Sequence, residues 1–352
     1  MNTTVRVSDR EIGPGLPTFI IAEMSANHGH DYERAVQVIR AAKQAGADAI
    51  KLQTYTPDTM TLDCRGEHFT VQGTAWHGRN LYELYGEAYT PWEWQPKLQE
   101  VAREEGLIFF STPFDATAVD FLEELQVPVF KVASFEIVDI PLLLKIAATG
   151  KPVIMSTGMA TLAEITEAVT ALADGGCRDL VLLKCTSAYP ASPEEMHLRT
   201  ITDLRERFGV PIGLSDHTLE VTMPAAAVAL GACVVEKHFT LDRGSGGPDS
   251  HFSLQPDEFA AMVKAVRTVE KALGEVRYGV KGEEDKQVMF RRSVFVAQDI
   301  RAGETLTPEN VRVVRPGVGL HPRDYAAVLG KRAAVDIKRG TPLSWEMVER
   351  ES

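Results

Sequence analysis

The chain has 352 residues, a net charge of −12, 44% hydrophobic residues and 24% charged residues. This is the balance of a globular protein with a sizeable core, and the length allows one large domain plus a small one, or two of medium size. The acidic charge argues against nucleic acid or an anionic membrane as the main partner. An anionic small molecule would need a local basic pocket.

The cysteines and the N-terminus indicate the compartment. The four cysteines are scattered and no two form a CxxC pair, which favours reduced thiols over a disulfide framework or a zinc site. The N-terminal sequence MNTTVRVSDR lacks the apolar segment of a secretory signal. No apolar run approaches the roughly 18 residues of a membrane helix. We therefore expect a soluble cytoplasmic protein with no membrane partner.

Eight short β-rich runs alternate with amphipathic, helix-like stretches from Thr18 onward. The runs are TFIIAE, AIKLQTY, LIFFSTP, VFKVAS, PVIMSTG, LVLLKCT, PIGLSDH and VVEKHFT. Because they are continuous apolar runs, they predict a parallel sheet that is covered on both faces. Eight such units in roughly 260 residues predict an α/β fold, a (β/α)8 TIM barrel. A doubly wound open sheet is the rival, but no GxGxxG turn follows the first run.

The rhythm changes after the helical stretch 256–274. The charged segment 276–290 is expected to be a linker, and the short β-rich runs and turns of residues 291–352 suggest a separate small domain. Residues 1–275 are then the barrel domain. Within the barrel, residues 57–89 form a long insertion after the second run, and loops of that length are usually functional or disordered.

Every predicted strand carries polar side chains toward its carboxyl end, the face where barrel active sites lie. Side chains two positions apart on a strand lie on the same side. This spacing pairs Lys51 with Gln53, Ser215 with His217, and Glu236 with His238.

Three lysines, Lys51, Lys131 and Lys184, lie within these strands. Burying a lysine is costly unless it meets an anion. A structural ion pair would explain any one of them, but three at the same end of the barrel favour an anion-binding pocket.

Two histidines, His217 and His238, end the seventh and eighth strands. A lone strand-end histidine is more often structural, but neighbouring strand ends bring side chains close together. Two imidazoles with open positions suit a divalent transition metal that also binds substrate. Glu236 is a candidate third ligand or a group that orients a ligand, and Asp249 is a candidate carboxylate facing the metal. Asp216 alternates to the other side and is expected to be structural.

The ordered segments of the chain resemble the sialic acid synthase family, whose members condense phosphoenolpyruvate with an amino sugar to a nine-carbon 2-keto acid. The resemblance covers about residues 17–348, and the C-terminal part is similar to the antifreeze-like (SAF) domain of these enzymes. It is carried by IAEMSANHG, AIKLQTYTPDTMTLD, IFFSTPFD, FKVASFEI, STGMATLAEI, LLKCTSAYPA, IGLSDHT, EKHFTLDR and GGPD.

Within the family, three segments are most similar to the pseudaminic acid synthase branch, which uses 2,4-diacetamido-2,4,6-trideoxy-L-altrose. They are YTPDTMTLD, TAWHGRNLYELYGEAYTPWEW and KCTSAYPA. Ser187 stands where N-acetylneuraminate synthases typically have Asn. Those enzymes and the legionaminate synthases are the neighbouring branches.

The resemblance implies substrate and metal sites. A divalent metal, Mn²⁺ first with Mg²⁺ or Co²⁺ as alternatives, would bind His217 and His238. Phosphoenolpyruvate would be held by Lys51, Lys131, Ser134, Ser156, Ser187 and Ser215. The acetamido deoxy-hexose would meet Glu23, Gln53, Tyr189, Asp249 and Arg315.

The resemblance also implies catalytic carboxylates and an assembly. Glu23 is the first candidate for acid/base work and Asp249 the second, and Glu136 is expected near the metal or the reacting atoms. Arg315 resembles the residue that reaches into a partner subunit's site, which implies a domain-swapped homodimer.

Two other functions remain open on the sequence. A Schiff-base aldolase would use Lys131 or Lys184 as its nucleophile and would need no metal. The C-terminal domain also allows a non-enzymatic function, as a sugar-binding or ice-binding module. The many polar residues at the strand ends argue against it.

Overall fold

The computed structural model describes residues 1–349. The chain divides into two compact units, Met1–Gly274 and the remainder from Glu275. No helix of residues 1–349 is both long and apolar enough to cross a membrane.

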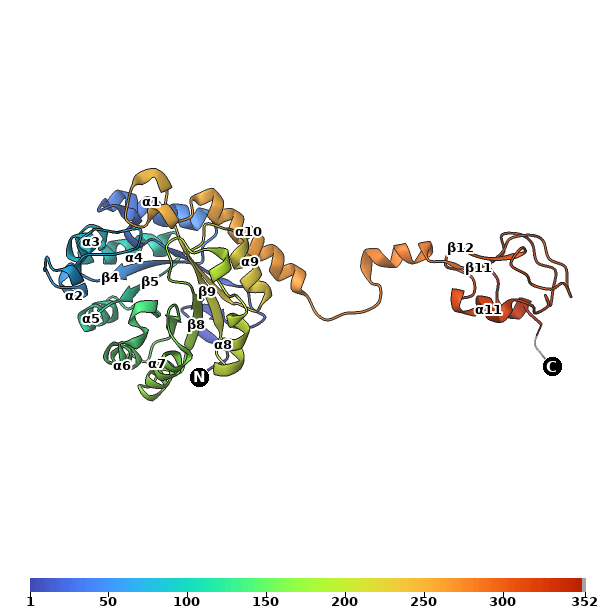
Figure 1. The fold of residues 1–352 in the computed structure, drawn as a ribbon, viewed down its shortest axis with the longest axis horizontal. Helices are drawn as coiled ribbons and strands as arrows, with labels where there is room; N and C mark the ends of the chain where they lie inside the picture. Colours follow the sequence, from blue (N-terminus) through green and yellow to red (C-terminus); the bar gives the residue numbers. More distant parts are fainter. Residues whose placement is uncertain (350–352) are drawn as a thin grey trace. The chain divides into compact units, whose positions relative to one another are not determined.

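The first unit is a closed barrel of eight parallel strands in chain order, with the last strand beside the first (Figure 1). The prediction of a (β/α)8 barrel is confirmed. The strands are β3 (Phe19–Glu23), β4 (Ala49–Thr54), β5 (Ile108–Pro113), β6 (Phe130–Val132), β7 (Val153–Ser156), β8 (Leu180–Cys185), β9 (Ile212–Asp216) and β10 (Val234–His238).

A helix layer surrounds these strands, and it explains why the strands are apolar on both sides. One principal helix follows each strand. The helices are α1 (Tyr32–Gln44), α4 (Gln95–Glu104), α5 (Ala116–Glu124), α6 (Ile140–Ala147), α7 (Leu162–Asp174), α8 (Thr200–Phe208), α9 (Thr222–Ala229) and α10 (Pro256–Leu273).

Local sequence signals set where these helices begin. The side chain of Asp31 accepts a hydrogen bond from the backbone N–H of Arg34 and starts α1. Thr161 and Glu164 form a reciprocal capping box at the start of α7. Apolar residues then recur at helical spacing and turn one face of each helix toward the barrel.

A short antiparallel hairpin precedes the barrel and was not expected from the sequence. Its strands are β1 (Val5–Val7) and β2 (Arg10–Ile12), and their inward side chains join the barrel core. Asn2 donates a hydrogen bond to Asp179, just before β8, and an arginine of β2 forms an ion pair with Asp48, just before β4. The hairpin therefore covers the amino ends of the strands and leaves the carboxyl ends for the site.

The insertion 57–89 is structured, with α2 (Pro57–Met60), the 3-10 helix η2 (Glu67–Phe69) and α3 (Leu81–Ala88). Its exposed arginines form ion pairs with glutamates of α3 itself. Trp76 donates a hydrogen bond from its ring Nε1 to the carbonyl oxygen of Pro248, 3.0 Å away. The insertion is thus fixed to the loop that follows β10.

The second unit has a core of its own, formed around Val294, Val311 and Val328. It contains the hairpin β11 (Ser293–Val296) and β12 (Val311–Val314), with isolated bridges between other short segments. Its remaining elements are η8 (Gly282–Phe290), η9 (Pro322–Asp324), α11 (Tyr325–Val328) and η10 (Trp345–Met347). Most of the stretch expected as a linker is therefore the 3-10 helix η8.

Candidate active site

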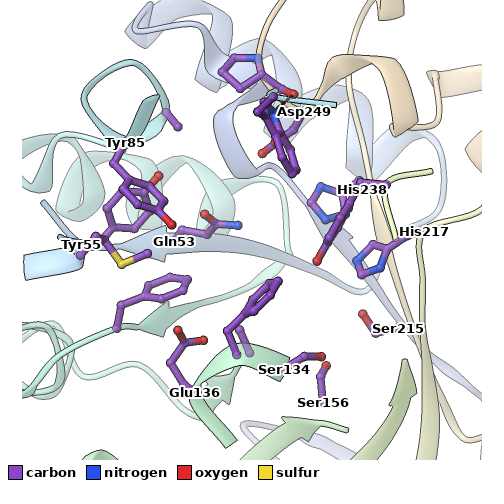
Figure 2. Close-up of a pocket in the computed structure, with 18 of the residues that line it drawn as sticks. Gln53, Tyr55, Tyr85, Ser134, Glu136, Ser156, Ser215, His217, His238 and Asp249 are labelled. Carbon is purple, nitrogen blue, oxygen red and sulfur yellow. Dashed lines mark hydrogen bonds between the residues drawn. The ribbon is translucent and has the colours of Figure 1, made fainter. Parts of the chain in front are cut away.

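A pocket of about 430 Å³ opens at the carboxyl ends of the barrel strands, and the insertion supplies part of its wall. Figure 2 shows the polar side chains converging on it from several strands. Among the residues predicted from the sequence, those that line it are Lys51, Gln53, Lys131, Ser134, Glu136, Ser156, Tyr189, Ser215, His217, Glu236, His238 and Asp249.

Four predicted residues, namely Glu23, Lys184, Ser187 and Arg315, are not among those that line this pocket. Glu23 is buried behind the wall, where its carboxylate lies 2.7 Å from the ammonium nitrogen of Lys51 and accepts a hydrogen bond from the Gln53 amide at 2.9 Å. Ser187 lies beside the pocket, with its hydroxyl 3.9 Å from the Cys185 sulfur. Arg315 belongs to the second unit, where its guanidinium carbon lies 5.9 Å from the centroid of the Phe290 ring.

Two buried lysines face one carboxylate at the base of the pocket. The Nζ atoms of Lys51 and Lys131 lie 3.7 Å and 3.8 Å from Oε1 of Glu236. Burial opposes ionisation of Glu236, but the lysines outweigh it and lower the pKa of this carboxyl. Burial lowers the pKa of Lys131. Both ammonium groups lie where water is scarce, so an anion that contacts them directly would be held strongly.

The third lysine is a correction to the sequence analysis, because Lys184 does not face the pocket. Its Nζ donates hydrogen bonds to the carbonyl oxygen of Cys185 at 2.6 Å and to the hydroxyl of Thr186 at 3.1 Å. The adjacent Cys185 lines the pocket instead. Successive residues of a strand point to opposite sides, so only one of the two can face inward.

Serine hydroxyls line the pocket close to Lys131, and one of them contacts its ammonium group. Its Nζ donates a hydrogen bond to Ser156 Oγ at 2.6 Å, and Ser134 Oγ accepts one from the backbone N–H of Gly158 at 3.1 Å. A Cβ atom at Gly158 would collide with the hydroxyls of Ser134 and Ser187. Glycine at this position therefore lets the backbone approach the serines closely.

The two predicted metal-binding histidines lie together. Their ring centroids are 5.3 Å apart. Nδ1 of His217 lies 2.8 Å from the carbonyl oxygen of Thr186; a carbonyl only accepts, so Nδ1 carries the proton and Nε2 keeps its lone pair. Nδ1 of His238 is buried and has no hydrogen-bond partner among the described residues 1–349, and burial lowers the pKa of this histidine well below its ordinary value. The neutral imidazole of His238 fits a metal ion. Burial opposes the charged form of His217, but the contact with Cys185 outweighs it and raises the pKa of His217, so a metal would have to bind its neutral form.

The carboxylates expected at the metal, Glu236 and Asp249, do not form a ligand group with the histidines. Within residues 1–349, no group of three or more His, Cys, Asp or Glu side chains is arranged to hold a metal ion. Glu236 is directed at the two lysines and accepts a hydrogen bond from Ser215 at 3.3 Å. The protein therefore offers two imidazole ligands, and the remaining positions would belong to substrate and water.

Asp249 and Tyr189 border the pocket on the side of the histidines. The Asp249 carboxylate accepts hydrogen bonds from the Ser25 hydroxyl and, at 3.4 Å, from the backbone N–H of Ala26. Burial raises the pKa of Asp249. The ring of Tyr189 lies over that of His217, with centroids 4.3 Å apart. Asp216, by contrast, forms a fully buried ion pair with a lysine on the far side of the strand, as expected of a structural carboxylate.

The opposite end of the pocket is apolar and was not identified from the sequence. Tyr55, which follows β4, contacts Phe114 and Tyr85 edge to face, with ring centroids 5.2 Å and 5.7 Å away. Met60 of α2 also lines this end. Figure 2 shows Tyr55 and Tyr85 across the pocket from the histidines. The only sequence signal was the aromatic content of the insertion and of the segment after it.

Glu136 lies near this apolar end. Its Oε2 atom is buried and has no hydrogen-bond partner within residues 1–349. Burial raises the pKa of the Glu136 carboxyl to about 7. Such a group can gain or lose a proton near neutral pH.

Comparison with known proteins shows which family this chain resembles. The NeuB family model matches residues 38–278, and the SAF domain model matches residues 291–349. Among curated proteins, the pseudaminic acid synthase of Campylobacter jejuni subsp. jejuni serotype O:2 is 48% identical over 92% of this chain and 95% of its own length. That of Helicobacter pylori is 45% identical over 95% of this chain and 98% of its own. The N,N'-diacetyllegionaminic acid synthase of Legionella pneumophila is 36% identical over 96% of each.

Two solved structures resemble this chain over most of its length. The N-acetylneuraminic acid synthetase of Leptospira borgpetersenii, in complex with citrate, superposes with a TM-score of 0.73 at 32% identity, covering 82% of this chain and 96% of that one. The spore coat polysaccharide biosynthesis protein SpsE of Bacillus subtilis covers 99% of this chain and 100% of its own, with a TM-score of 0.68 at 32% identity. The chain therefore belongs to the NeuB family, the sialic acid synthase family that its sequence resembles, and carries a C-terminal SAF domain.

Proposed function

We propose that this chain is a pseudaminic acid synthase. It would condense phosphoenolpyruvate with 2,4-diacetamido-2,4,6-trideoxy-L-altrose and water to give a nine-carbon 2-keto sugar acid and phosphate. The identities of 45% and 48% to proteins of that name support the choice. The structural observation that carries it is the pocket itself, with two buried lysines at its base and an apolar wall at its other end.

In the proposed reaction, C3 of phosphoenolpyruvate attacks the aldehyde carbon of the open-chain sugar. The new carbon–carbon bond forms from the enol double bond and leaves positive charge at C2. The π electrons of the aldehyde move to its oxygen, and this alkoxide takes up the proton that the attacking water loses. Water adds to C2 and loses a proton. The resulting tetrahedral intermediate expels phosphate, and the keto group forms.

Lys51 and Lys131 would bind the carboxylate and phosphate of phosphoenolpyruvate, with Ser134, Ser156 and Ser215 completing the cradle. Charge-assisted hydrogen bonds of this kind are strongest in a pocket that excludes water. The same ammonium groups would stabilise the negative charge that develops on the departing phosphate. Ser187 would support them from beside the pocket.

His217 and His238 would hold the divalent metal, with Mn²⁺ as the first choice and Mg²⁺ or Co²⁺ as alternatives. When bound, the metal supplies Lewis-acid polarisation of the sugar's carbonyl oxygen. The contact between His217 and the carbonyl of Thr186 fixes the ring orientation and leaves Nε2 for the ion.

Proton transfer would fall to the carboxylates of the site. Asp249 and Glu136 line the pocket and can exchange protons with sugar or water directly. Glu23 contacts Lys51 and Gln53 behind the wall, so it would reach the reacting atoms through them. Gln53, Tyr189 and Asp249 would contact the sugar.

The assembly proposed from the family resemblance is a cytoplasmic, domain-swapped homodimer in which Arg315 completes the partner's site. Co-expression of a Lys131→Gln chain with an Arg315→Ala chain tests it. If the arginine acts across the dimer, mixed dimers contain one intact site, and about a quarter of all sites recover activity. If the arginine acts within its own chain, no site recovers, and the swapped arrangement is wrong.

The proposed function is tested by phosphoenolpyruvate-dependent phosphate release with three sugars, each with and without chelator. They are the diacetamido-altrose, N-acetylmannosamine and the legionaminate precursor. We expect fastest release with the first and loss of release in EDTA. Turnover that survives EDTA, together with borohydride trapping of Lys131, would instead support the Schiff-base aldolase.

A further inference from the structure

We propose that the insertion 57–89 builds an apolar subsite that receives a methyl-bearing substituent of the sugar and thereby selects the sugar. The inference rests on the proposed function and names the part of the pocket that sets its specificity. The residues of this apolar subsite are Tyr55, Met60, Leu84, Tyr85 and Phe114.

The apolar subsite is assembled from three places in the chain. Tyr55 follows β4, Phe114 follows β5, and the other three residues lie in α2 and α3 of the insertion. Tyr55 packs edge to face against both Tyr85 and Phe114, at interplanar angles of 79° and 81°. Only 2% of Tyr55 is exposed. The three rings hold one another in place, so the cavity beside them has a fixed shape.

The chemistry of the two substrates decides which of them reaches this end. Phosphoenolpyruvate is a small anion, and the lysines that attract it lie at the base of the pocket, around Glu236. An anion placed among aromatic rings would lose its hydration without compensation. The sugar is therefore the substrate that extends to the apolar subsite, and its apolar groups are methyl groups.

The insertion also fixes the distance between this subsite and the reacting atoms. The Nε1–H of Trp76 donates to Pro248 in the loop that carries Asp249, and its ring centroid lies 5.7 Å from that of Tyr189. Tyr189 in turn covers His217. One segment thus contacts both ends of the pocket, so a sugar held at one end is positioned at the other.

Two methyl sources share this chemistry, namely the C6 methyl of the deoxy sugar and the methyl of an acetamido group. A hydroxyl added at C6 would lose its hydration against the aromatic rings of Tyr55, Tyr85 and Phe114, which weakens binding. Loss of the C4 acetyl group would place a charged amine there instead. Substrate analogues with each change therefore distinguish the two sources.

The experiment measures kcat/KM for the diacetamido-altrose, its 6-hydroxy analogue and its C4-amine analogue, together with KM for phosphoenolpyruvate. The enzymes compared are wild type, Tyr85→Ser, Phe114→Ser and the conservative Tyr85→Phe. Leu62→Ser is the matched control, because Leu62 lies on the same insertion, is 64% exposed and does not line the pocket. Thermal unfolding of each variant checks the fold.

We expect wild type to prefer the diacetamido-altrose over at least one analogue by about ten-fold to a hundred-fold. The two serine variants should reduce that preference to within about three-fold and leave KM for phosphoenolpyruvate unchanged. Tyr85→Phe and Leu62→Ser should keep the preference. The analogue whose discrimination falls identifies the methyl group that occupies the subsite.

An unchanged preference in both serine variants overturns the inference. An equal loss of kcat/KM with all three sugars does so too, because it shows a structural role alone. If wild type releases no phosphate with any sugar, the proposed function fails and the inference fails with it. If the wild type turns over the sugar and no variant alters its preference, the inference is wrong but the proposed function is unaffected.

Discussion

The imidazole rings of His217 and His238 lie side by side at the ends of neighbouring strands, with their planes inclined by 56°. The register of β9 and β10 produces this contact, because it pairs Ser215 with Glu236 and each histidine follows two positions later. One ring is oriented by a backbone carbonyl, and the other has a buried nitrogen with no hydrogen-bond partner within residues 1–349. The two rings therefore differ in their surroundings, and their proximity is consistent with the proposal that both bind one metal ion.

Replacing His238 by Ala should remove metal binding. With one imidazole left, the affinity for Mn²⁺ should fall by at least about ten-fold to a hundred-fold, and turnover should be lost. Titration calorimetry with Mn²⁺ measures the affinity without any substrate. His68→Ala is the control, because His68 is exposed on the insertion and should bind as wild type does. Full activity of the His238 variant would contradict the metal assignment.

Two lysines, Lys131 on β6 and Lys184 on β8, should respond differently to substitution. Lys131→Gln should lower kcat/KM for phosphoenolpyruvate by about a hundred-fold or more, because it removes a buried charge that meets the substrate anion. Lys184→Gln should leave kcat/KM within a few-fold of wild type, because its ammonium group contacts Cys185 and Thr186 away from the pocket. Steady-state kinetics of the two variants provide the comparison, and equal losses would show that the pocket has been assigned wrongly.

The buried pair of Asp216 and Lys237 should matter for stability. The Lys237 nitrogen lies 2.6 Å from the Asp216 carboxylate, and both side chains are fully buried. Lys237→Met should lower the free energy of unfolding by about 3–5 kcal/mol, because it leaves an unpaired buried charge. The double variant Asp216→Asn/Lys237→Met should recover part of the loss. Urea denaturation measures both, and a double variant less stable than the single would contradict this explanation.

Glu136 should make stability depend on pH. Burial raises the pKa of its carboxyl from 4.5 to about 7. The stability that this group contributes is therefore fully present below about pH 4.5 and is lost as the pH rises through about 7. At pH 8, Glu136→Gln should be more stable than wild type by about 1–3 kcal/mol, and at pH 4.5 the two should agree. Urea denaturation at both pH values checks this; equal differences at the two would refute it.

The barrel fold and the polar side of the pocket could be predicted from the apolar strands and the polar residues at their ends. Continuous apolar runs indicated a covered parallel sheet, and spacing by two brought together Lys51, Ser215, His217 and their neighbours. The same rule could not place Lys184, because a polar residue at a strand end can face either side and only its partners decide which. Three-residue strands such as those of the N-terminal hairpin give too short a pattern to detect.

The apolar subsite was missed for a different reason. Tyr55, Tyr85 and Phe114 come from separate segments, and apolar or aromatic residues in a sequence are ordinarily assigned to a core. Nothing in their spacing distinguishes side chains that fill the interior from side chains that border a cavity. Only the packing of the insertion against the ends of β4 and β5 shows the difference.

The barrel strands supply the polar base of the pocket, and the insertion supplies much of its apolar end. Most of the residues proposed to bind phosphoenolpyruvate lie on or next to the barrel strands, where a change in one strand disturbs its neighbours. The residues of 57–89 are one contiguous segment with its own caps and ion pairs. Under the proposed function, exchange of that one segment would reshape the sugar site and leave the lysines and serines of the barrel in place.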